Sequence, residues 1–431
     1  MSSFINGKYL LRDARIFVTR GPLFNFLNPD FWYIMNQSTQ KRHIDRLNID
    51  PSIEITKKHI DEGINWLLTN QELQPDDGIS TDLNFKFSGV KLNSSFPEVT
   101  GYILPTLFEY ARMFNSEKAR NGALKASEWE LTFQGDEGSF PGGRVGFLGG
   151  PSVFNTAQIV HGLVRAFKET NDDKYKEACV KACDWMVSTQ EADGSWKKHN
   201  FNNISRTYDT KVAEAILQTN EIADNPKYLE SARKQMSFVL LNQTENGWFY
   251  NCDNSIERNH HPLMHLIGYT LQGLLVCNEY LKDDKILRAS EKSLKRLLHI
   301  FEVSKKALIG RYNSDWKPVS NSTCVTGDAQ ISLCWMQLFE INNDYRYLNG
   351  AFKMNDFLKS IQYKTTNVKI NGSLPQSFPF WGDYGHYKIN SWGVKYYLDA
   401  LMQEYRLKQE QLNGQHQPQG QDQDQLAEEQ A

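Results

Sequence analysis

Apolar side chains recur at helical spacing along most of the chain, in two alternating kinds of segment. In the first kind, Tyr228, Ala232, Met236 and Val239 form a single apolar stripe among Lys, Glu and Arg, which is typical of a helix with one face in water. In the second kind, for example residues 159–164 (IVHGLV), apolar or small side chains cover almost every face. This second pattern predicts helices that pack on several sides.

The alternation is a tandem repeat. Each half-solvated segment runs into a Gln and then into an acidic or Asn-Gly turn, with the Gln residues at positions 71, 134, 190, 243 and 362 and a degenerate copy near residues 297–310. The second series of helices starts at landmarks that follow the same period, namely Glu98, Asn155, Asp209, His265, Asp328 and Asn390. Six helical hairpins therefore span about residues 50–408. We predict an all-α fold, an (α/α)6 toroid with inner and outer helix rings; an open solenoid is the competing geometry.

The connections of the predicted toroid differ in length on its two faces. Inner-to-outer connections are short capping turns such as residues 171–174 (NDDK), whereas outer-to-inner connections run to 19–28 positions and are rich in Gly, Trp, Phe, Tyr and Arg. Long loops inside a compact domain are usually functional or disordered, and this aromatic composition argues against disorder. All six long loops should lie where the inner helices begin, so the helix dipoles favour anionic groups at that face.

Three regions follow from the extent of the repeat. Residues 1–48 precede it as an aromatic and basic extension that either packs on the toroid or helps cover its mouth. Residues 49–406 form the toroid domain. Residues 407–431 are rich in Gln and contain no aromatic side chain, so we predict a disordered, solvated tail.

Composition narrows the possible partners. Lys and Arg number 48 against 51 Asp and Glu, without a basic block, which argues against nucleic acid as a partner. No window approaches 18 uninterrupted apolar residues and no secretory signal is visible, so we expect no membrane span and a cytoplasmic location. The six cysteines form no Cys-x-x-Cys pair, and we expect reduced thiols, no metal and no cofactor.

Candidate site residues are polar or aromatic groups at the start of an inner helix or in the loop before it. The alternative interpretation is that the helix-start residues are helix caps and that the loop aromatics are packing groups. The predicted catalytic residues are Glu98, Tyr208, Asp209, His265, Asp315 and Asp328. The predicted substrate-binding residues are Arg206, Arg311, Tyr312, Trp316, Trp381, Asp383, His386, Tyr387 and Asn390. Aromatic faces ringed by hydrogen-bonding groups suit sugar recognition.

The Gln-x-x-x-Asp/Asn-Gly turns and the helix starts PEVTGY, FNTAQ, YDTKVA and TGDAQ resemble the six-hairpin glycosidase-like superfamily, particularly bacterial members associated with surface-polysaccharide synthesis. The repeat is also similar to that of terpene cyclases and prenyltransferases, but the Asp-x-Asp-Asp and Asp-Asp-x-x-Asp motifs of those enzymes are absent. The first resemblance implies a carbohydrate-active protein that takes an oligosaccharide or polysaccharide, with an acidic sugar as the expected substrate.

Several functions stay open at this point. A glycoside hydrolase needs two carboxyl groups at the glycosidic bond, and the candidates are Glu98, Asp209, Asp315 and Asp328. A uronate lyase or epimerase needs a cation for the sugar carboxylate, from Arg206 or Arg311, and a proton-transfer group, from Tyr208, Tyr312 or His265. The remaining alternatives are a non-catalytic glycan-binding or assembly protein and, ranked below it, an isoprenoid cyclase. On the enzyme hypothesis, Asp209→Asn, Asp315→Asn or Arg311→Ala should abolish turnover and leave the fold intact.

Overall fold

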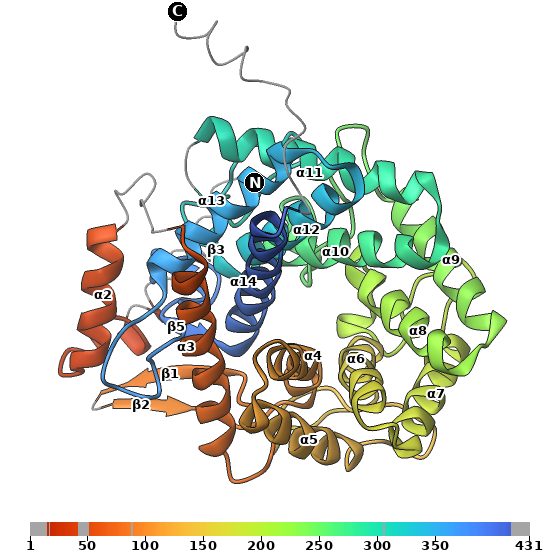
Figure 1. Cartoon of the computed structure of the whole chain (residues 1–431), viewed down its shortest axis with the longest axis horizontal. Helices are drawn as coiled ribbons and strands as arrows, with labels where there is room; N and C mark the ends of the chain where they lie inside the picture. Colours follow the sequence, from red (N-terminus) through yellow and green to blue (C-terminus); the bar gives the residue numbers. More distant parts are fainter. Residues whose placement is uncertain (1–14, 17, 42–50, 88, 305–306, 415–431) are drawn as a thin grey trace, which may run out of the picture.

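The computed structural model describes residues 15–16, 18–41, 51–87, 89–304 and 307–414, and its main body is a ring of paired helices (Figure 1). The outer helices are α3 (Ile53–Glu72), α5 (Glu117–Leu131), α7 (Asp173–Ser188), α9 (Pro226–Leu241), α11 (Asp284–Ser304) and α13 (Tyr345–Ile361). The inner helices are α4 (Pro97–Phe114), α6 (Val153–Thr170), α8 (Thr210–Ala223), α10 (Met264–Leu281), α12 (Val325–Asn342) and α14 (Ser391–Leu412).

The ring is closed. Each inner helix packs against the next along the chain, and the last, α14, packs against both α3 and α4 of the first hairpins. The inner helices are buried on most faces, as in α12, where every residue from Val325 to Met336 is buried. The predicted (α/α)6 toroid is therefore confirmed, and the open solenoid is excluded.

Five repeated Gln residues each join the outer helix that they end to the next outer helix. Gln134 donates from Nε2 to the carbonyl of Gly138 in its own turn and to the carbonyl of Ala178 on α7, at 3.0 and 2.8 Å. Gln190 makes the same pair of bonds to Gly194 and to Ser231 on α9, at 2.8 and 3.0 Å. The turn glycine has a positive φ of 89° at Gly194, where a residue with a side chain is strained. The sequence repeat is thus a repeated hydrogen-bonded clamp.

Short turns on the opposite face connect inner to outer helices, as predicted. Asn115, Asn171 and Asn343 end their helices in the left-handed conformation, which Asn tolerates better than most residues. The next residue or two then cap the following helix, as Ser116 does by accepting from the amide of Ala119 at 3.3 Å.

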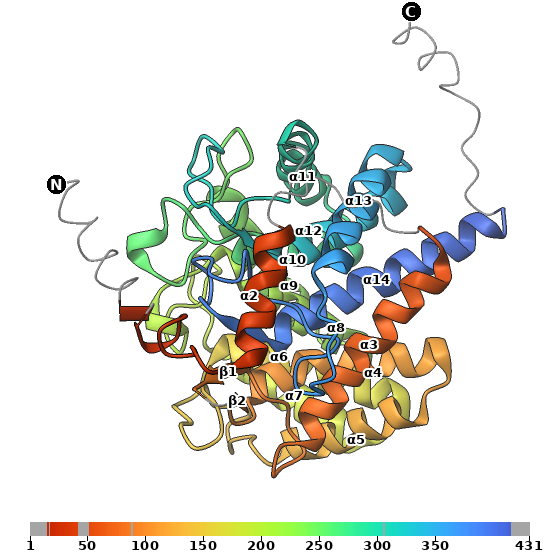
Figure 2. The same ribbon diagram turned by 90° about the vertical axis from the view of Figure 1, so that its left-hand side faces the viewer.

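The long loops carry small sheets that the sequence did not predict. Strand β1 (Asp82–Lys86) pairs antiparallel with β2 (Gly89–Leu92) and with β5 (Lys388–Asn390), and β3 (Thr323–Cys324) pairs with β4 (Ser377–Phe378). In the described part of the loops there are also three single 3-10 turns, η1 (Phe201–Asn203), η2 (Thr207–Asp209) and η3 (Ile256–Arg258). Figure 2 shows the strands and loops on the left, with α14 running away from them to the right. The pairing of β1 with β5 joins the first and last long loops.

The extension before the toroid contains α2 (Pro29–Lys41), which packs on this loop face. Phe31 is fully buried and its ring contacts those of Phe85, Phe380 and Tyr387, with centroids 5.5–6.1 Å apart. The hydroxyl of Tyr33 donates to the carbonyl of Lys364 at 2.6 Å. Two roles were expected for the extension, packing on the toroid or covering its mouth. The described part of the extension packs on the toroid.

At the other end of the chain, α14 extends further than the predicted boundary at residue 407. Leu407 is fully buried, and the helix continues to Leu412, whose side chain is exposed. Residues 415–431 of the predicted tail lie outside the described residues. All six cysteines are buried and none is in a disulfide, as predicted. None of the described helices is long and apolar enough to cross a bilayer.

Candidate active site

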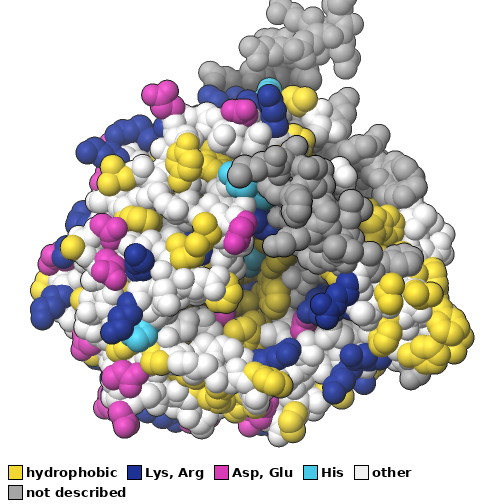
Figure 3. Space-filling model, turned by 180° about the vertical axis from the view of Figure 1, so that it is seen from behind, with side chains coloured by type: hydrophobic (Ala, Val, Ile, Leu, Met, Phe, Trp, Pro, Cys, Tyr) yellow, Lys and Arg dark blue, Asp and Glu magenta, His cyan; other side chains and the backbone are white. Residues whose placement is uncertain are grey.

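A cavity of about 950 Å³ opens among the long loops, at the N-terminal ends of the inner helices. First-turn residues of α4, α6, α10 and α14 line it, together with η2 and the loops 142–152 and 198–203. Figure 3 looks at the face hidden in Figure 1 and shows a hollow near its centre with hydrophobic side chains inside. The position predicted from loop lengths therefore holds a cavity.

Glu98 is the one carboxylic acid among the described residues that line this cavity. It lies in the first turn of α4, directly after Pro97 at the start of the helix. Burial raises the pKa of Glu98 to about 7, because a desolvated carboxylate is disfavoured relative to the neutral acid. The side chain is consequently able to hold a proton near neutral pH and to release it to a bound group.

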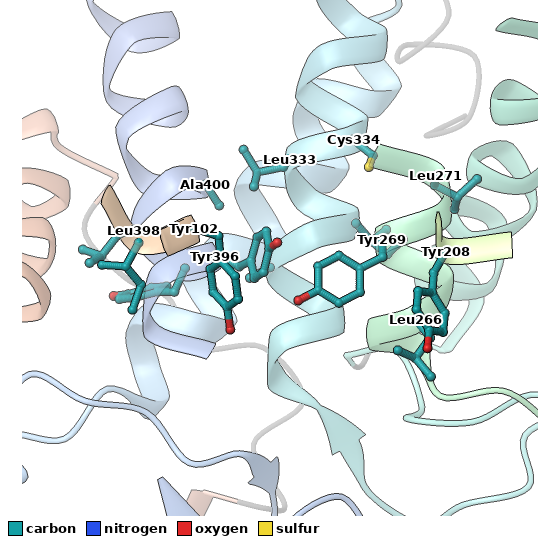
Figure 4. Close-up of a cluster of buried hydrophobic side chains, with 14 of the residues drawn as sticks. Tyr102, Tyr208, Leu266, Tyr269, Leu271, Leu333, Cys334, Tyr396, Leu398 and Ala400 are labelled. Carbon is teal, nitrogen blue, oxygen red and sulfur yellow. The ribbon is translucent and has the colours of Figure 1, made fainter. Parts of the chain in front are cut away.

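Tyrosine side chains from separate elements form a buried cluster (Figure 4), and three of them line the cavity. Tyr102 lies one helical turn after Glu98, Tyr208 is in η2 and Tyr269 is in α10, whereas Tyr396, in α14, packs against Tyr102 and Tyr269 behind the lining. The rings of Tyr102 and Tyr396 are stacked with centroids 6.2 Å apart, and those of Tyr269 and Tyr396 are 5.8 Å apart. In Figure 4 the hydroxyl of Tyr269 points towards Tyr102 and Tyr396. The cavity thus combines flat apolar rings with phenolic hydroxyl groups.

His265, in the first turn of α10, lines the same cavity. Its Nδ1 lies 2.8 Å from Oε1 of Gln330, and its ring lies 4.3 Å from that of Tyr269 between centroids. Burial lowers the pKa of His265 to about 4, so the ring is neutral at neutral pH. With Nδ1–H donating to Gln330, Nε2 is the nitrogen that accepts a proton.

Amide side chains, one lysine and a second histidine complete the lining. Asn155 is held by the hydroxyl of Ser152, which donates to its Oδ1 at 2.8 Å, and the hydroxyl of Tyr208 donates to Oδ1 of Asn254. Lys198 and His199 line the cavity in the loop before η1. Amides offer both donors and acceptors, which suits a ligand with several hydroxyl groups.

Three of the predicted site residues, Glu98, Tyr208 and His265, line the cavity. Asp209 does not: it is fully buried behind Asn200, whose Nδ2 donates to its Oδ2 at 2.7 Å. Burial raises the pKa of Asp209 to about 8. Asn200 itself faces the cavity, so Asp209 supports the lining from behind, because η2 turns its carboxyl inward.

The other two predicted carboxylic acids lie elsewhere. Asp328 is fully buried and accepts from the hydroxyl of Thr323, and burial raises its pKa well above the usual range. Asp315 has 67% of its side chain exposed and pairs loosely with Lys317 at 4.0 Å. The expectation that these acids share one site with Glu98 is corrected, because the first faces the core and the second faces solvent.

The two predicted arginines are likewise outside the lining. Arg206 is fully buried and donates to the carbonyls of Ser205 and Asn254, at 3.3 and 3.0 Å. Arg311 donates to Oδ2 of Asp253 at 2.8 Å and to the carbonyl of His261 at 2.9 Å. Both guanidinium groups brace loops, because each donates to loop carbonyls and Arg311 donates to Asp253 as well.

The aromatic loop residues Tyr312 and Trp316 pack instead of facing the cavity. The hydroxyl of Tyr312 accepts from the amide of Ile309 at 2.8 Å, and the indole of Trp316 donates to the carbonyl of Asn246 at 3.0 Å. Both side chains are buried. This outcome matches the alternative interpretation, in which loop aromatics are packing groups.

The predicted cluster in the last long loop is structural as well. Asp383 accepts from the hydroxyls of Ser320 and Ser322, at 3.1 and 2.9 Å, and Nδ1 of His386 lies 2.9 Å from the carbonyl of Trp381. Tyr387 packs on Phe31 and Phe380, as described above, and none of these residues lines the cavity. Asn390 caps α14 by accepting from the amide of Gly393 at 3.1 Å.

Several lining residues were not predicted, namely Phe96, Tyr102, Phe147, Phe154, Asn155, Lys198, His199, Asn200, Asn254, Tyr269, Tyr384 and Trp392. Tyr102 and Tyr269 follow Glu98 and His265 by four positions, so helical periodicity alone places them on the same face. The indole of Trp392 donates to the hydroxyl of Tyr384 at 2.9 Å, a contact between a helix and a loop for which the sequence gives no signal.

No protein-family model matches the chain, and no curated protein matches it in sequence. Solved structures, in contrast, match the fold of the chain. An unsaturated glucuronyl hydrolase specific for heparin superposes with a TM-score of 0.65 at 13% identity, covering 83% of this chain and 99% of the other. At this level of identity the likeness shows a shared fold, the (α/α)6 toroid of six helical hairpins.

Two further members of this fold give the same picture. An unsaturated glucuronyl hydrolase from Bacillus sp., responsible for the degradation of glycosaminoglycan, has a TM-score of 0.62 at 12% identity, with 80% of this chain and 96% of that chain covered. A novel alpha-amylase from Clostridium perfringens has a TM-score of 0.58 at 14% identity, with coverages of 80% and 98%. These similarities establish the six-hairpin toroid over most of the chain.

Proposed function

We propose that this protein is a carbohydrate-active enzyme that binds an acidic oligosaccharide or polysaccharide in the central cavity and uses Glu98 to transfer a proton to it. The observation that carries the proposal is the position of Glu98, a carboxylic acid with a pKa of about 7 in the first turn of an inner helix. Solved structures with this fold include hydrolases of glucuronyl groups, and glucuronate is an acidic sugar.

Hydrolysis with Glu98 as the general acid is the first form of this function. A glycosidase needs a protonated carboxylic acid beside the leaving oxygen, and a pKa near the working pH makes such an acid effective. The aromatic rings of Tyr102, Tyr269 and Trp392 supply flat surfaces for sugar rings, and the amides around them supply hydrogen-bond partners for hydroxyl groups.

A lyase or epimerase is the second form, and one observation favours it. No second carboxylic acid lines the cavity among the described residues, whereas His265 and Tyr208 do line it. Proton removal from C5 of a uronate requires one base and one acid, which His265 or Tyr208 and Glu98 provide. Hydrolysis by the usual pair of carboxyl groups instead requires a second acid.

An acidic substrate is favoured by the charge of the cavity. Four inner helices direct their N-terminal ends at it, and the positive ends of helix dipoles favour anions. Lys198 adds a cation to the lining, while Glu98 is largely neutral below its pKa. The polar amides also make the cavity a poor site for an isoprenoid, because hydrocarbon would leave them unpaired. The predicted cytoplasmic location stays a prediction.

One set of incubations tests both forms. Purified protein is mixed with neutral and uronate-containing oligosaccharides, and products are followed by reducing ends, by the absorbance of unsaturated sugars and by deuterium uptake at C5. New reducing ends without unsaturation indicate a hydrolase, unsaturated products a lyase, and deuterium uptake alone an epimerase. Saturable binding without any product over long incubation would contradict the enzymatic proposal and favour the glycan-binding alternative.

A further inference from the structure

A second groove of about 510 Å³ lies beside the cavity. It is bordered by β2, by the turn after α3, by the glycine-rich loop 142–150 and by the loop that contains Lys369. Both the cavity and the groove are lined by Phe147. The two depressions therefore meet at this one side chain.

The groove is lined by cations without anions. Lys91, Arg144 and Lys369 line it, and no Asp or Glu does among the described residues. Elsewhere on the surface many cations are paired, as Lys174 is with Glu128 at 2.6 Å, but within the described part of the chain none of these three has a carboxylate within ion-pair distance. Lys369 contacts the carbonyl of Val90 at 3.5 Å, and Arg144 lies 5.3 Å from the ring centroid of Phe147. Three cations on three separate segments, none with a carboxylate partner among the described residues, favour an anionic ligand.

The glycine-rich loop holds Arg144 and Phe147 at the junction. The amide of Gly149 donates to the carbonyl of Gly142 at 2.7 Å, and that of Gly142 donates to the carbonyl of Gly150 at 3.0 Å. Val145 anchors the loop to the strand end, because its amide donates to Ser95 at 2.9 Å and its carbonyl accepts from the hydroxyl of Ser94 at 2.8 Å. Phe147 nevertheless has 74% of its surface exposed, an unusual position for a large apolar side chain on an anchored loop.

We infer that this basic groove is an outer subsite for a polyanionic glycan chain, an inference that rests on the proposed function. Sugar units beyond the reacting unit leave the cavity across the ring of Phe147, and their carboxylate or sulfate groups bind Lys91, Arg144 and Lys369. The protein therefore prefers long acidic chains over short ones. Figure 3 agrees with this direction, since Lys and Arg side chains gather between the central hollow and the right-hand edge.

Binding can be measured without turnover. Glu98→Gln protein is titrated by calorimetry with an oligoglucuronate disaccharide, an oligoglucuronate octasaccharide and a neutral glucose octasaccharide, at low and at high salt. We expect the acidic octasaccharide to bind about tenfold or more tightly than the disaccharide, with a difference that shrinks at high salt because surface charges are screened. The neutral octasaccharide should show no such salt dependence.

Removing the groove cations gives the decisive comparison. In the Glu98→Gln background, replacement of Lys91, Arg144 and Lys369 by Ala should remove the octasaccharide preference and leave disaccharide binding unchanged. Phe147→Ala should weaken the binding of the acidic and the neutral octasaccharide alike, because stacking does not depend on charge. The matched control replaces Lys227, Lys292 and Arg296, which are exposed on the outer helices α9 and α11, and should retain the preference.

An octasaccharide preference that survives the triple groove variant, or that disappears equally in the matched control, would overturn the outer subsite. Absence of turnover in the wild-type protein would count against the proposed enzyme but not against this binding result. Loss of disaccharide binding in the triple variant would also contradict the inference, because it would place the cations in the cavity.

Discussion

Gln362, at the end of the last outer helix, donates from Nε2 to the carbonyl of His59 on the first outer helix at 3.1 Å. The same nitrogen donates to the carbonyl of Gly372 at 2.9 Å, and Nδ1 of His59 lies 2.5 Å from Oε1 of Gln362. This is the clamp that Gln134 and Gln190 make between neighbouring hairpins, repeated across 303 positions of sequence. The bond that links one repeat to the next therefore also closes the ring.

We expect Gln362→Ala to lower the free energy of unfolding by about 1–3 kcal/mol, because it removes the donor to two carbonyl groups and leaves the buried Nδ1 of His59 without its Gln362 partner. Urea unfolding followed by circular dichroism measures the change. Gln190→Ala is the matched control within the ring and should cost a similar amount. A wild-type midpoint for Gln362→Ala alone would show that closure does not depend on the clamp.

Glu98→Gln should reduce turnover of an acidic oligosaccharide by about a hundredfold to ten-thousandfold, the usual range for a general acid or base. With Glu98 as the acid, kcat/KM should fall as the pH rises through about 7, where the carboxyl loses its proton. Rates measured from acidic to alkaline pH check the sign. An increase in kcat/KM through the same range would make Glu98 a base, and full activity in the Gln variant would remove it from the reaction.

Arg311→Ala should destabilise the protein instead of acting on substrate binding. Its guanidinium is the buried partner of Asp253, and removing one member of a buried ion pair typically costs about 3–5 kcal/mol. The exposed pair of Arg346 and Asp344 provides the control, since Arg346→Ala should cost less than about 1 kcal/mol. Thermal unfolding of the two variants separates these expectations. Unchanged stability with lost binding in Arg311→Ala would restore the role predicted from sequence.

The pH dependence of the free energy of unfolding should show the effect of the buried Asp209 carboxyl group. Its pKa of about 8 in the folded protein lies above the unfolded value of about 4, so folding favours the protonated form. This contribution is complete below pH 4 and is lost progressively as the pH rises towards 8. The Asp209→Asn variant does not lose this contribution as the pH rises. Its stability relative to wild type should therefore increase between pH 5 and pH 8, as measured by urea midpoints. Asp173→Asn, at an exposed position, is the control; a constant difference across this pH range would contradict the assignment.

The fold was predictable because its determinants repeat. Five of the six hairpins carry a Gln turn, and each of these Gln side chains bonds to the next outer helix, so the same information recurs along the chain and the last copy closes the ring by bonding to the first outer helix. The loop face was predictable from loop lengths for the same reason. The sheet between β1 and β5 was not, since its strands are three to five residues long and pair across more than 300 positions.

The site residues were predictable only where they lie on the inner helices and follow helical spacing. Glu98 and His265 lie in first turns that face the axis, and Tyr102 and Tyr269 could have been added by stepping one turn along each helix. Arg311 carries a similar sequence signal, a polar residue in a long loop, yet its partner Asp253 comes from a different loop. Which loop side chains bind each other depends on tertiary contacts that no local pattern encodes.

Tyr269 gives the sharpest test of the tyrosine cluster, because its hydroxyl points towards Tyr102 and Tyr396 while its ring packs on His265 and Phe154. Tyr269→Phe keeps the ring and removes only the hydroxyl. If this group orders the deep end of the cavity for substrate, kcat/KM should fall by about tenfold, corresponding to one hydrogen bond of about 1.4 kcal/mol, with little change in the unfolding midpoint. Tyr228→Phe removes a hydroxyl that binds Asp184 on an outer helix and should leave kcat/KM unchanged. Equal kinetic effects in both variants would mean that the loss reflects general loosening of the fold, and no effect in either would leave the hydroxyl of Tyr269 without a part in the reaction.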